Sequence, residues 1–237
     1  MLRLSGQRHL GSNPVPSIVL KFRKGEIVYA QGDPAADWFE VIAGTVRTCY
    51  LHVNGHRQLT GFYYQGDVFG IETGAHQSSA EAVTDVKLRR IYRALSEELC
   101  LTDRKRAFID SDALQGALHN ARDCIFLLGH RTAPERMAAF LWATSRRIGS
   151  NCKFQLPMSR SDIADHLGLT IHTVSRTLSE LVKRGIIILQ GPQTVIIADS
   201  NRLGELAGLS DEEQEPNYHA ATLSAYSKVP EFSQATG

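Results

Sequence analysis

The sequence lacks the features that mark membrane, secreted and metal-binding proteins. No run of apolar residues reaches the ~18 that a membrane-spanning helix needs, and residues 1–16 contain no apolar core of signal-peptide length. Cysteine is sparse, with four in 237 residues and no C-x-x-C pair. We therefore expect a cytoplasmic protein without a membrane partner, in which each cysteine is a small buried hydrophobe. The sequence leaves open whether Cys152 is redox-active.

Motifs of catalysis are also missing. The chain has no glycine-rich phosphate loop, no nucleophile elbow and no cluster of residues at metal-ligand spacing. These absences exclude the common classes of nucleotide-dependent enzyme, hydrolase and metalloenzyme. We predict that the protein is not an enzyme, and that it carries no cofactor and no metal.

The charge distribution is uneven although the formal net charge is only +1. Residues 131–190 hold nine lysines and arginines but four acidic residues, so the excess of positive charge is confined to one segment. A basic segment in an otherwise mildly acidic chain is a weak indication of a polyanionic partner. A solvated basic face is the alternative interpretation.

Short strands broken by glycines are predicted for residues 18–95. Asn54-Gly55 lies between apolar-rich segments and predicts a two-residue hairpin turn, because both residues tolerate positive φ. Many short strands with regular turns predict a sandwich, barrel or jelly roll. The glycines that punctuate this segment are Gly25, Gly32, Gly44, Gly55, Gly61, Gly66 and Gly70.

The apolar period changes to that of a helix over residues 107–130. Apolar side chains recur at steps of three and four and form a narrow seam. Such a seam favours a parallel helix pair in a homodimer, although it could instead pack on the strands. The residues assigned to dimerisation are Leu114, Leu118, Ala121, Ile125 and Leu128.

Three further helices are predicted in the C-terminal part. The first follows Gly129, with Pro134 in its first turn and Gly149 at its end. Two short helices then follow in residues 159–184, joined by a tight turn at Gly168, with Ser159 or Ser161 as the first N-cap. Their inner faces are formed by Ile163, Ala164, Leu167, Leu169, Val174 and Leu178, and the apolar segment GIIILQ after them is predicted to be a strand.

The second short helix carries the candidate recognition residues on its outer face. His172, Thr173, Ser175 and Arg176 all offer hydrogen-bond donors or acceptors. Such a helix fits the DNA major groove, where arginine makes the commonest specific contact with guanine. His172 could read a base, contact phosphate or cover the turn, and Thr170 is expected to be an N-cap or a phosphate contact. The alternative is a helical hairpin with a polar solvent face.

Taken together, these motifs make the chain resemble the Crp/Fnr superfamily of transcription regulators, and within it the Fnr/FixK-type branch. The resemblance rests on FRKGEIVYAQGD, VIAGTVR, GDVFGIE, RTAPERMAAFL and SRSDIADHLGLTIHTVSR, in this order. It implies an α+β fold with an N-terminal cyclic-nucleotide-binding-like β-roll, or jelly roll, a long dimerisation helix and a C-terminal winged helix-turn-helix. It also implies a homodimer on a palindromic site in double-stranded DNA, contact with RNA polymerase, and Ser159 and Arg160 as further DNA-binding residues.

We assign the parts accordingly: an N-terminal arm (1–17), a β-roll (18–106), a dimerisation helix (107–130), a winged helix-turn-helix (131–209) and a flexible tail (210–237).

Three departures from the family pattern limit what the resemblance implies. Cyclic-nucleotide binders have an arginine for the phosphate where this chain has Ser78 and Ser79. Iron-sulfur members have an N-terminal cysteine cluster, whereas the first cysteine here is Cys49. His172 stands where many members have a glutamate. We therefore expect regulation without cyclic AMP or an iron-sulfur cluster. The alternative is an effector-gated sensor of the same superfamily that binds a cyclic nucleotide, or haem through His76.

Overall fold

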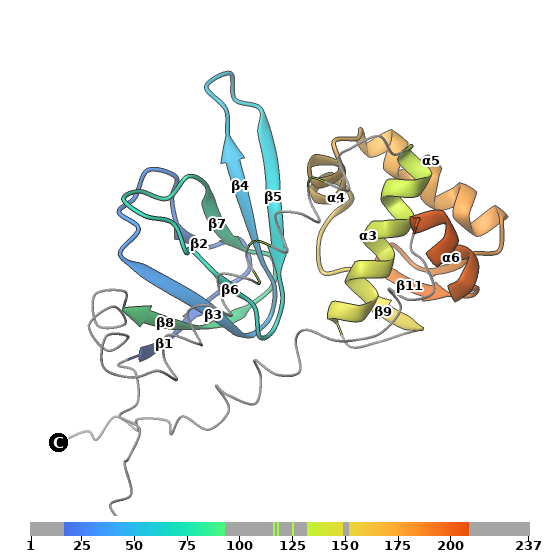
Figure 1. Ribbon diagram of the computed structural model, residues 1–237. Coiled ribbons are helices and arrows are strands. Elements are labelled where there is room, and N and C mark those ends of the chain that lie inside the picture. Colours follow the sequence, from blue (N-terminus) through green and yellow to red (C-terminus); the bar gives the residue numbers. More distant parts are fainter. Residues whose placement is uncertain are drawn as a thin grey trace, which may run out of the picture.

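The protein consists of an N-terminal β-roll and a C-terminal helical domain (Figure 1). The computed structural model describes residues 17–92, 132–148 and 152–208, together with Gly116, Leu118 and Ile125. None of the helices in these ranges has the length and apolar character needed to cross a membrane.

Two four-stranded antiparallel sheets form the β-roll. One sheet has the order β1-β8-β3-β6 and the other β2-β7-β4-β5, which confirms the predicted jelly-roll architecture. The strands are β1 (Ser17–Phe22), β2 (Ile27–Tyr29), β3 (Asp37–Ala43), β4 (Val46–Leu51), β5 (Arg57–Tyr63), β6 (Val68–Phe69), β7 (Ser79–Ala82) and β8 (Val86–Tyr92).

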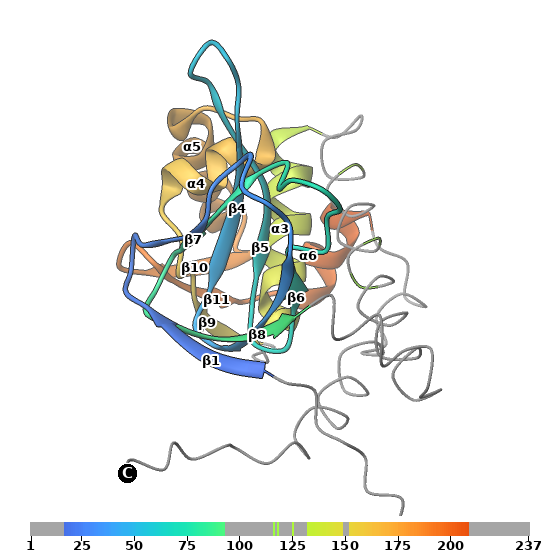
Figure 2. The same cartoon turned by 90° about the vertical axis from the view of Figure 1, so that its left-hand side faces the viewer.

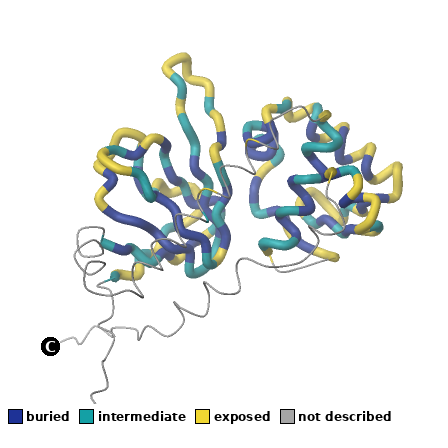
Figure 3. The backbone as a smooth tube through the Cα atoms, viewed as in Figure 1, coloured by how far each residue is buried: buried dark blue, intermediate teal, exposed yellow. Residues whose placement is uncertain are grey.

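Apolar side chains of both sheets meet between them, as the alternating pattern of a half-buried strand requires. Val41 on β3, Val46 on β4 and Leu88 on β8 are completely buried there. The cluster comprises Tyr29, Phe39, Val41, Val46, Phe69, Ala80, Ala82, Val86 and Leu88. Figure 3 shows buried segments inside this unit and inside the helical domain.

The β4–β5 hairpin projects from the roll, and its turn differs from the predicted one (Figure 1). The His52 N–H donates to the carbonyl of His56, so three residues rather than two form the loop. Within this loop, only Gly55 has a positive φ, at 82°. This geometry matches a hairpin loop in which a tight turn is closed by one left-handed glycine. The position of the turn was predicted correctly, but its type was wrong because Asn54 does not need a positive φ here.

The C-terminal domain is a winged helix-turn-helix. Its wing is a three-stranded antiparallel sheet in the order β10-β11-β9, and Ile187–Gln190 is the strand predicted from GIIILQ. The elements are α3 (Ala133–Arg147), β9 (Lys153–Gln155), α4 (Arg160–Leu167), α5 (Ile171–Lys183), β10 (Ile187–Gln190), β11 (Thr194–Ile197) and α6 (Ser200–Ala207).

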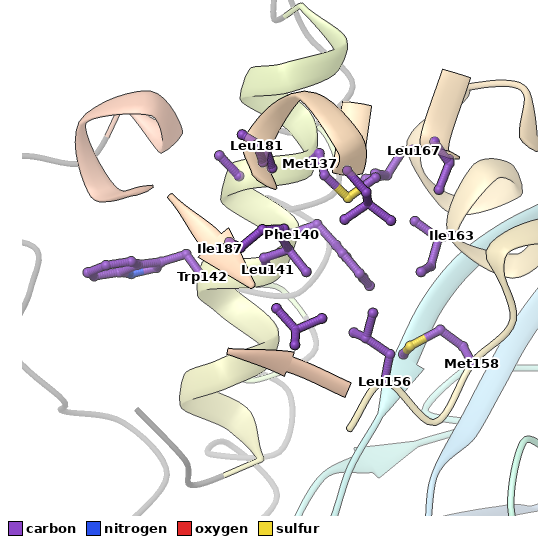
Figure 4. Packing of buried hydrophobic residues seen from close by; sticks show 14 of the residues in the cluster. Met137, Phe140, Leu141, Trp142, Leu156, Met158, Ile163, Leu167, Leu181 and Ile187 are labelled. Atoms are coloured by element: carbon purple, nitrogen blue, oxygen red, sulfur yellow. The ribbon is translucent and has the colours of Figure 1, made fainter. Parts of the chain in front are cut away.

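Helix α3 contributes several side chains to the core of this domain. Thr132 and Glu135 form a capping box at its start, with Pro134 in the first turn as predicted. Figure 4 shows Met137, Phe140 and Leu141 of this helix pointing towards side chains of α4, α5 and the wing. Met137 and Leu141 are completely buried. Replacing such a side chain with alanine costs about 2–5 kcal/mol.

Two residues of the predicted dimerisation seam are described. Leu118 and Ile125 are helical and exposed, at 53% and 72% of their surface. They are seven residues apart and so lie on one side of a helix. Leu114, Ala121 and Leu128 lie outside the described residues, as do most of the N-terminal arm, residues 93–115 and the tail.

The expectation that each cysteine is buried is wrong for the two that are described. Cys152 is exposed at the start of β9, and Cys49 on β4 is half-buried. Burial raises the pKa of the Cys49 thiol, against the lowering effect of Arg57 and Arg47. Cys100 and Cys124 lie outside the described residues.

Apolar packing continues from the roll into the helical domain. Leu59 and Phe62 of β5, with Tyr64 and Val83, belong to the same cluster as the core of α3, α4 and α5. His166 of α4 lies in this boundary, with its ring edge-on to Phe62 at 5.1 Å between centroids. The roll and the first helix of the helix-turn-helix therefore share a core.

The pKa of His166 is lowered from 6.5 to about 4, because burial disfavours its charged form more than the hydrogen bond to the Leu59 backbone favours it. The unfolded chain therefore takes up a proton at a higher pH than the folded chain. The free energy of unfolding should fall by about 2 kcal/mol between about pH 7 and about pH 5 from this group alone. Urea unfolding of the wild type and His166→Gln measures it, with the smaller pH dependence expected in the variant. Identical pH dependence would contradict this origin.

Candidate DNA-binding interface

Helix α4 begins with a capping box. The Ser159 hydroxyl accepts a hydrogen bond from the Asp162 N–H at 3.1 Å, and the Asp162 carboxylate accepts from the Ser159 N–H and hydroxyl. Such a cap contributes about 1 kcal/mol to helix stability. Ser159, rather than Ser161, is therefore the N-cap of the two candidates. Arg160 is half-buried, and its guanidinium lies 3.5 Å from the Pro192 carbonyl of the wing.

A three-residue turn joins α4 to α5. Gly168 ends α4 with φ 62° and ψ 40°, a left-handed conformation that suits glycine. The Leu169 N–H then donates to the Ala164 carbonyl, and the Leu169 side chain packs against the core. Ala164 is buried, as expected of a small residue where two helices cross closely.

Thr170 is the N-cap of α5. Its hydroxyl accepts a hydrogen bond from the Thr173 N–H at 3.1 Å and lies 2.9 Å from the Thr173 hydroxyl. This confirms the N-cap prediction, and it leaves Thr170 exposed at the positive end of the helix dipole, where a phosphate is favoured.

Helix α5 has an apolar inner face and a polar outer face. Val174 and Leu178 are buried against α3 and α4, as predicted, and so are Thr177 and Leu181. His172, Ser175 and Arg176 are exposed on the other side, and Thr173 is half-buried. The helical period thus brings the predicted recognition residues together on one surface.

His172 and Arg176 have no hydrogen-bond or ion-pair partner within the described part of the chain. They are one turn apart and exposed in the first half of α5, the part of a recognition helix that reaches base edges. Ser175 is exposed as well, and its backbone carbonyl accepts a hydrogen bond from the Ser179 hydroxyl. The surface is free to meet a ligand.

Ile171 is a candidate that the sequence analysis missed. It is the first residue of α5 and has 49% of its surface exposed. An apolar side chain at this place can contact the methyl group of thymine. Its position directly after the N-cap was the signal in the sequence.

Part of the basic segment serves the fold rather than a ligand. Arg136 donates to the Leu167 carbonyl, which fixes α3 to the end of α4. Arg147 pairs with Asp67 of the roll and lies over the ring of Tyr64. Among the described residues of α5, exposed positive charge outside such contacts comes from Arg176 and Lys183, because Arg184 at the C-cap pairs with Glu180 at 3.6 Å.

The segment of the roll that corresponds to the family's nucleotide-binding motif makes contacts with other side chains of the roll. The ring of His76 stacks on Tyr29 at 3.6 Å, and its Nδ1 lies 2.6 Å from the Glu72 carboxylate. His76 is a loop residue with a polar partner, and it is buried. Ser78 is buried, and the Ser79 hydroxyl accepts from the Gln31 N–H. Between Gly70 and Ala80 the chain has no arginine or lysine to balance a cyclic phosphate.

This arrangement does not fit a cyclic nucleotide, because the carboxylate is occupied and the cation is missing. It does not favour a haem ligand either, because His76 is only 3% exposed and its ring face packs on Tyr29. The described residues contain no cluster of three or more side chains that could hold a metal ion.

Two family models match the chain, one for each unit. The cyclic nucleotide-binding domain matches residues 19–103, and the Crp-like helix-turn-helix domain matches residues 135–206. The second match covers α4 and α5 together with most of α3 and the wing.

Curated relatives extend the similarity over both units. The nitrogen fixation regulation protein FixK of Rhizobium meliloti is 38% identical over 201 residues, which is 84% of this chain and 92% of that protein. The electron transport regulator A of Shewanella oneidensis is 34% identical over 78% of this chain and 77% of its own length.

Among solved structures, FixK2 from Bradyrhizobium japonicum is similar with a TM-score of 0.78 and 37% identity, covering 83% of this chain and 100% of that one. Together with the helix-turn-helix geometry, these similarities establish what the motifs suggested: the chain belongs to the Crp/Fnr family of transcription regulators, as a FixK- and Fnr-like member with a DNA-binding helix-turn-helix.

Proposed function

We propose that the protein binds a palindromic promoter site as a homodimer and regulates transcription without cyclic AMP, haem or an iron-sulfur cluster. The observation that carries this proposal is the surface of α5, where His172, Ser175 and Arg176 are exposed and the apolar side is fully packed. Each protomer would place one such helix in the major groove of one half-site.

Roles within this surface follow from donor and acceptor geometry. Arg176 would form two hydrogen bonds with the O6 and N7 atoms of a guanine, while His172 and Ser175 would read neighbouring positions. Ile171 would contact a thymine methyl. Thr170, Thr173, Ser159 and Arg160, which lie at the two helix starts, would contact phosphates and fix the register.

Constitutive activity is supported by the contact of His76 with Glu72 and by the missing cation in the same segment. Because Glu72 is engaged by His76 and no arginine or lysine lies between Gly70 and Ala80, a ligand with a cyclic phosphate would find neither a free carboxylate nor a counter-charge. Control would then act through the amount of protein. The roll would serve as a structural support and as a surface for RNA polymerase in the cytoplasm, and the protein would have no enzymatic activity.

Dimerisation is supported by the exposure of Leu118 and Ile125. A single chain leaves more than half of each side chain in water, and apolar area removed from water is worth about 25 cal/mol per Å². A second copy with the same seam would cover both.

His172 and Arg176 should determine different base pairs. Arg176→Ala should weaken operator binding by about 1–3 kcal/mol and relax preference at one base pair per half-site. His172→Glu should change the preferred base at a neighbouring position, towards the TTGAT-type half-site expected of Fnr-like proteins with glutamate there. The measurement is selection of binding sites from randomised DNA, at fixed salt and without any nucleotide, because phosphate contacts depend on salt.

Lys183→Ala is the matched control, since it removes one exposed positive charge from the far end of α5. It should leave the selected motif unchanged. If His172→Glu selects the wild-type motif and Arg176→Ala weakens all sequences equally, neither side chain reads bases.

Charged residues in the seam should separate the protomers. Leu118→Glu combined with Ile125→Glu places like charges opposite each other across the pair, so sedimentation should show monomers with poor operator affinity. Ile27→Glu, a change at an exposed apolar residue of the roll, is the control and should remain dimeric. A fully dimeric double variant would refute the assignment of the seam.

A further inference from the structure

Two arginines of the β-roll reach across to the first helix of the helix-turn-helix. Arg47 on β4 donates from Nη1 to Asp162 Oδ1 at 2.6 Å. Arg57 on β5 donates from Nη2 to the same oxygen at 2.9 Å and to Asp165 Oδ2 at 2.8 Å. These four side chains, which we name the interdomain ion-pair cluster, connect strands and helix over more than 100 residues of sequence.

The cluster is shielded from water at its centre. The Asp162 side chain is 4% exposed and that of Arg47 15%, whereas Arg57 and Asp165 lie nearer the edge. A partly buried pair with several hydrogen bonds is screened less than a surface pair, and losing one partner leaves the other charge unbalanced. Arg47 is in turn held by Glu81, its cross-strand neighbour on β7, at 2.6 Å.

The two carboxylate oxygens of Asp162 bind different partners. Oδ2 accepts from the Ser159 N–H and hydroxyl and so fixes the start of α4, while Oδ1 accepts from both arginines. Burial by itself raises the pKa of this carboxyl, but the Ser159 hydrogen bonds and the arginines outweigh it, so that the pKa lies below its usual value. The charged form of the carboxyl group is therefore the one that pairs with Arg47 and Arg57.

The cluster acts together with the apolar contact beside it. Phe62 of β5 lies against His166, on the same helix as Asp162 and Asp165. Figure 2 views the molecule from the side of the roll, with α4 and α5 in the upper part of the helical domain. Because α5 packs on α4 and α3 around one core, an orientation imposed on α4 is passed to the recognition helix.

We propose that Arg47 and Arg57 are positioning residues for DNA binding, which hold the helix-turn-helix of each protomer at the orientation that two half-sites require. This inference rests on the proposed homodimeric function. Half-sites of such dimers lie about 34 Å apart, one turn of DNA, so a small rotation of one domain loses the second half-site. The ion pairs supply the orientation that a bound effector would otherwise have to impose.

The test compares two DNA duplexes, one with both half-sites of the operator selected by the wild type and one with a single half-site. Arg57→Ala should lower affinity for the first duplex at least fivefold, the lower end of the about 5- to 150-fold range usual for coupling between sites. Affinity for the single half-site should stay within about twofold, because the recognition surface of α5 is untouched.

A double-mutant cycle makes the test specific for the ion pair. Asp165→Ala removes the partner from the helix side at a half-exposed position that makes no cap, and alanine is a good helix former. The double variant Arg57→Ala/Asp165→Ala should bind two half-sites no more weakly than the weaker single variant. Arg90→Ala removes an arginine paired with Asp37 inside the roll and should bind like the wild type.

The outcomes separate the two levels of the account. If the wild type does not prefer two half-sites, the proposed homodimeric function fails, and the positioning role fails with it. If the wild type prefers them and Arg57→Ala keeps the full preference, only the positioning role is overturned. Equal losses on both duplexes, or additive effects in the cycle, would show a general loss of structure and would also overturn it.

Discussion

A single hydrophobic cluster joins the two units, and the interdomain ion pairs lie beside it. Leu59 and Phe62 of β5 belong to the same buried set as Met137 and Leu141 of α3 and the inner side chains of α4 and α5. Close packing of this kind tolerates few alternative arrangements, because a gap or a rotation loses many contacts at once. The core of the helix-turn-helix therefore continues into the roll.

The elements of the candidate site were readable from the sequence because their causes are local. Gly168 for the turn, a threonine as N-cap of α5, and apolar residues at helical spacing all act within a few residues of the backbone that they shape. The outer face of α5 follows from the same period. Asn54-Gly55 predicted the hairpin but not the length of its loop. The pairing of the flanking strands sets that length, as the hydrogen bond from the His52 N–H to the His56 carbonyl shows.

The interdomain contacts could not be predicted in this way. Nothing near Arg47 or Arg57 in the sequence indicates a partner, and their carboxylates lie 105 to 115 residues away on α4. Likewise, the basic excess of residues 131–190 does not reveal that Arg136 and Arg147 are engaged in contacts within the protein. The stacking of His76 on Tyr29 could not be predicted either, because the two residues are far apart in the sequence. These contacts are set by the tertiary fold, which brings together residues that are far apart in the sequence.

The central claim is that the domain arrangement that suits DNA already exists without an effector. The most direct measurement is an experimentally determined structure of the protein on its selected operator, in the absence of any nucleotide. We expect α5 to lie in the major groove while the Asp162 carboxylate still accepts hydrogen bonds from Arg47 and Arg57. A complex in which α5 occupies the groove but α4 has rotated away from β5, with these ion pairs broken, would contradict it.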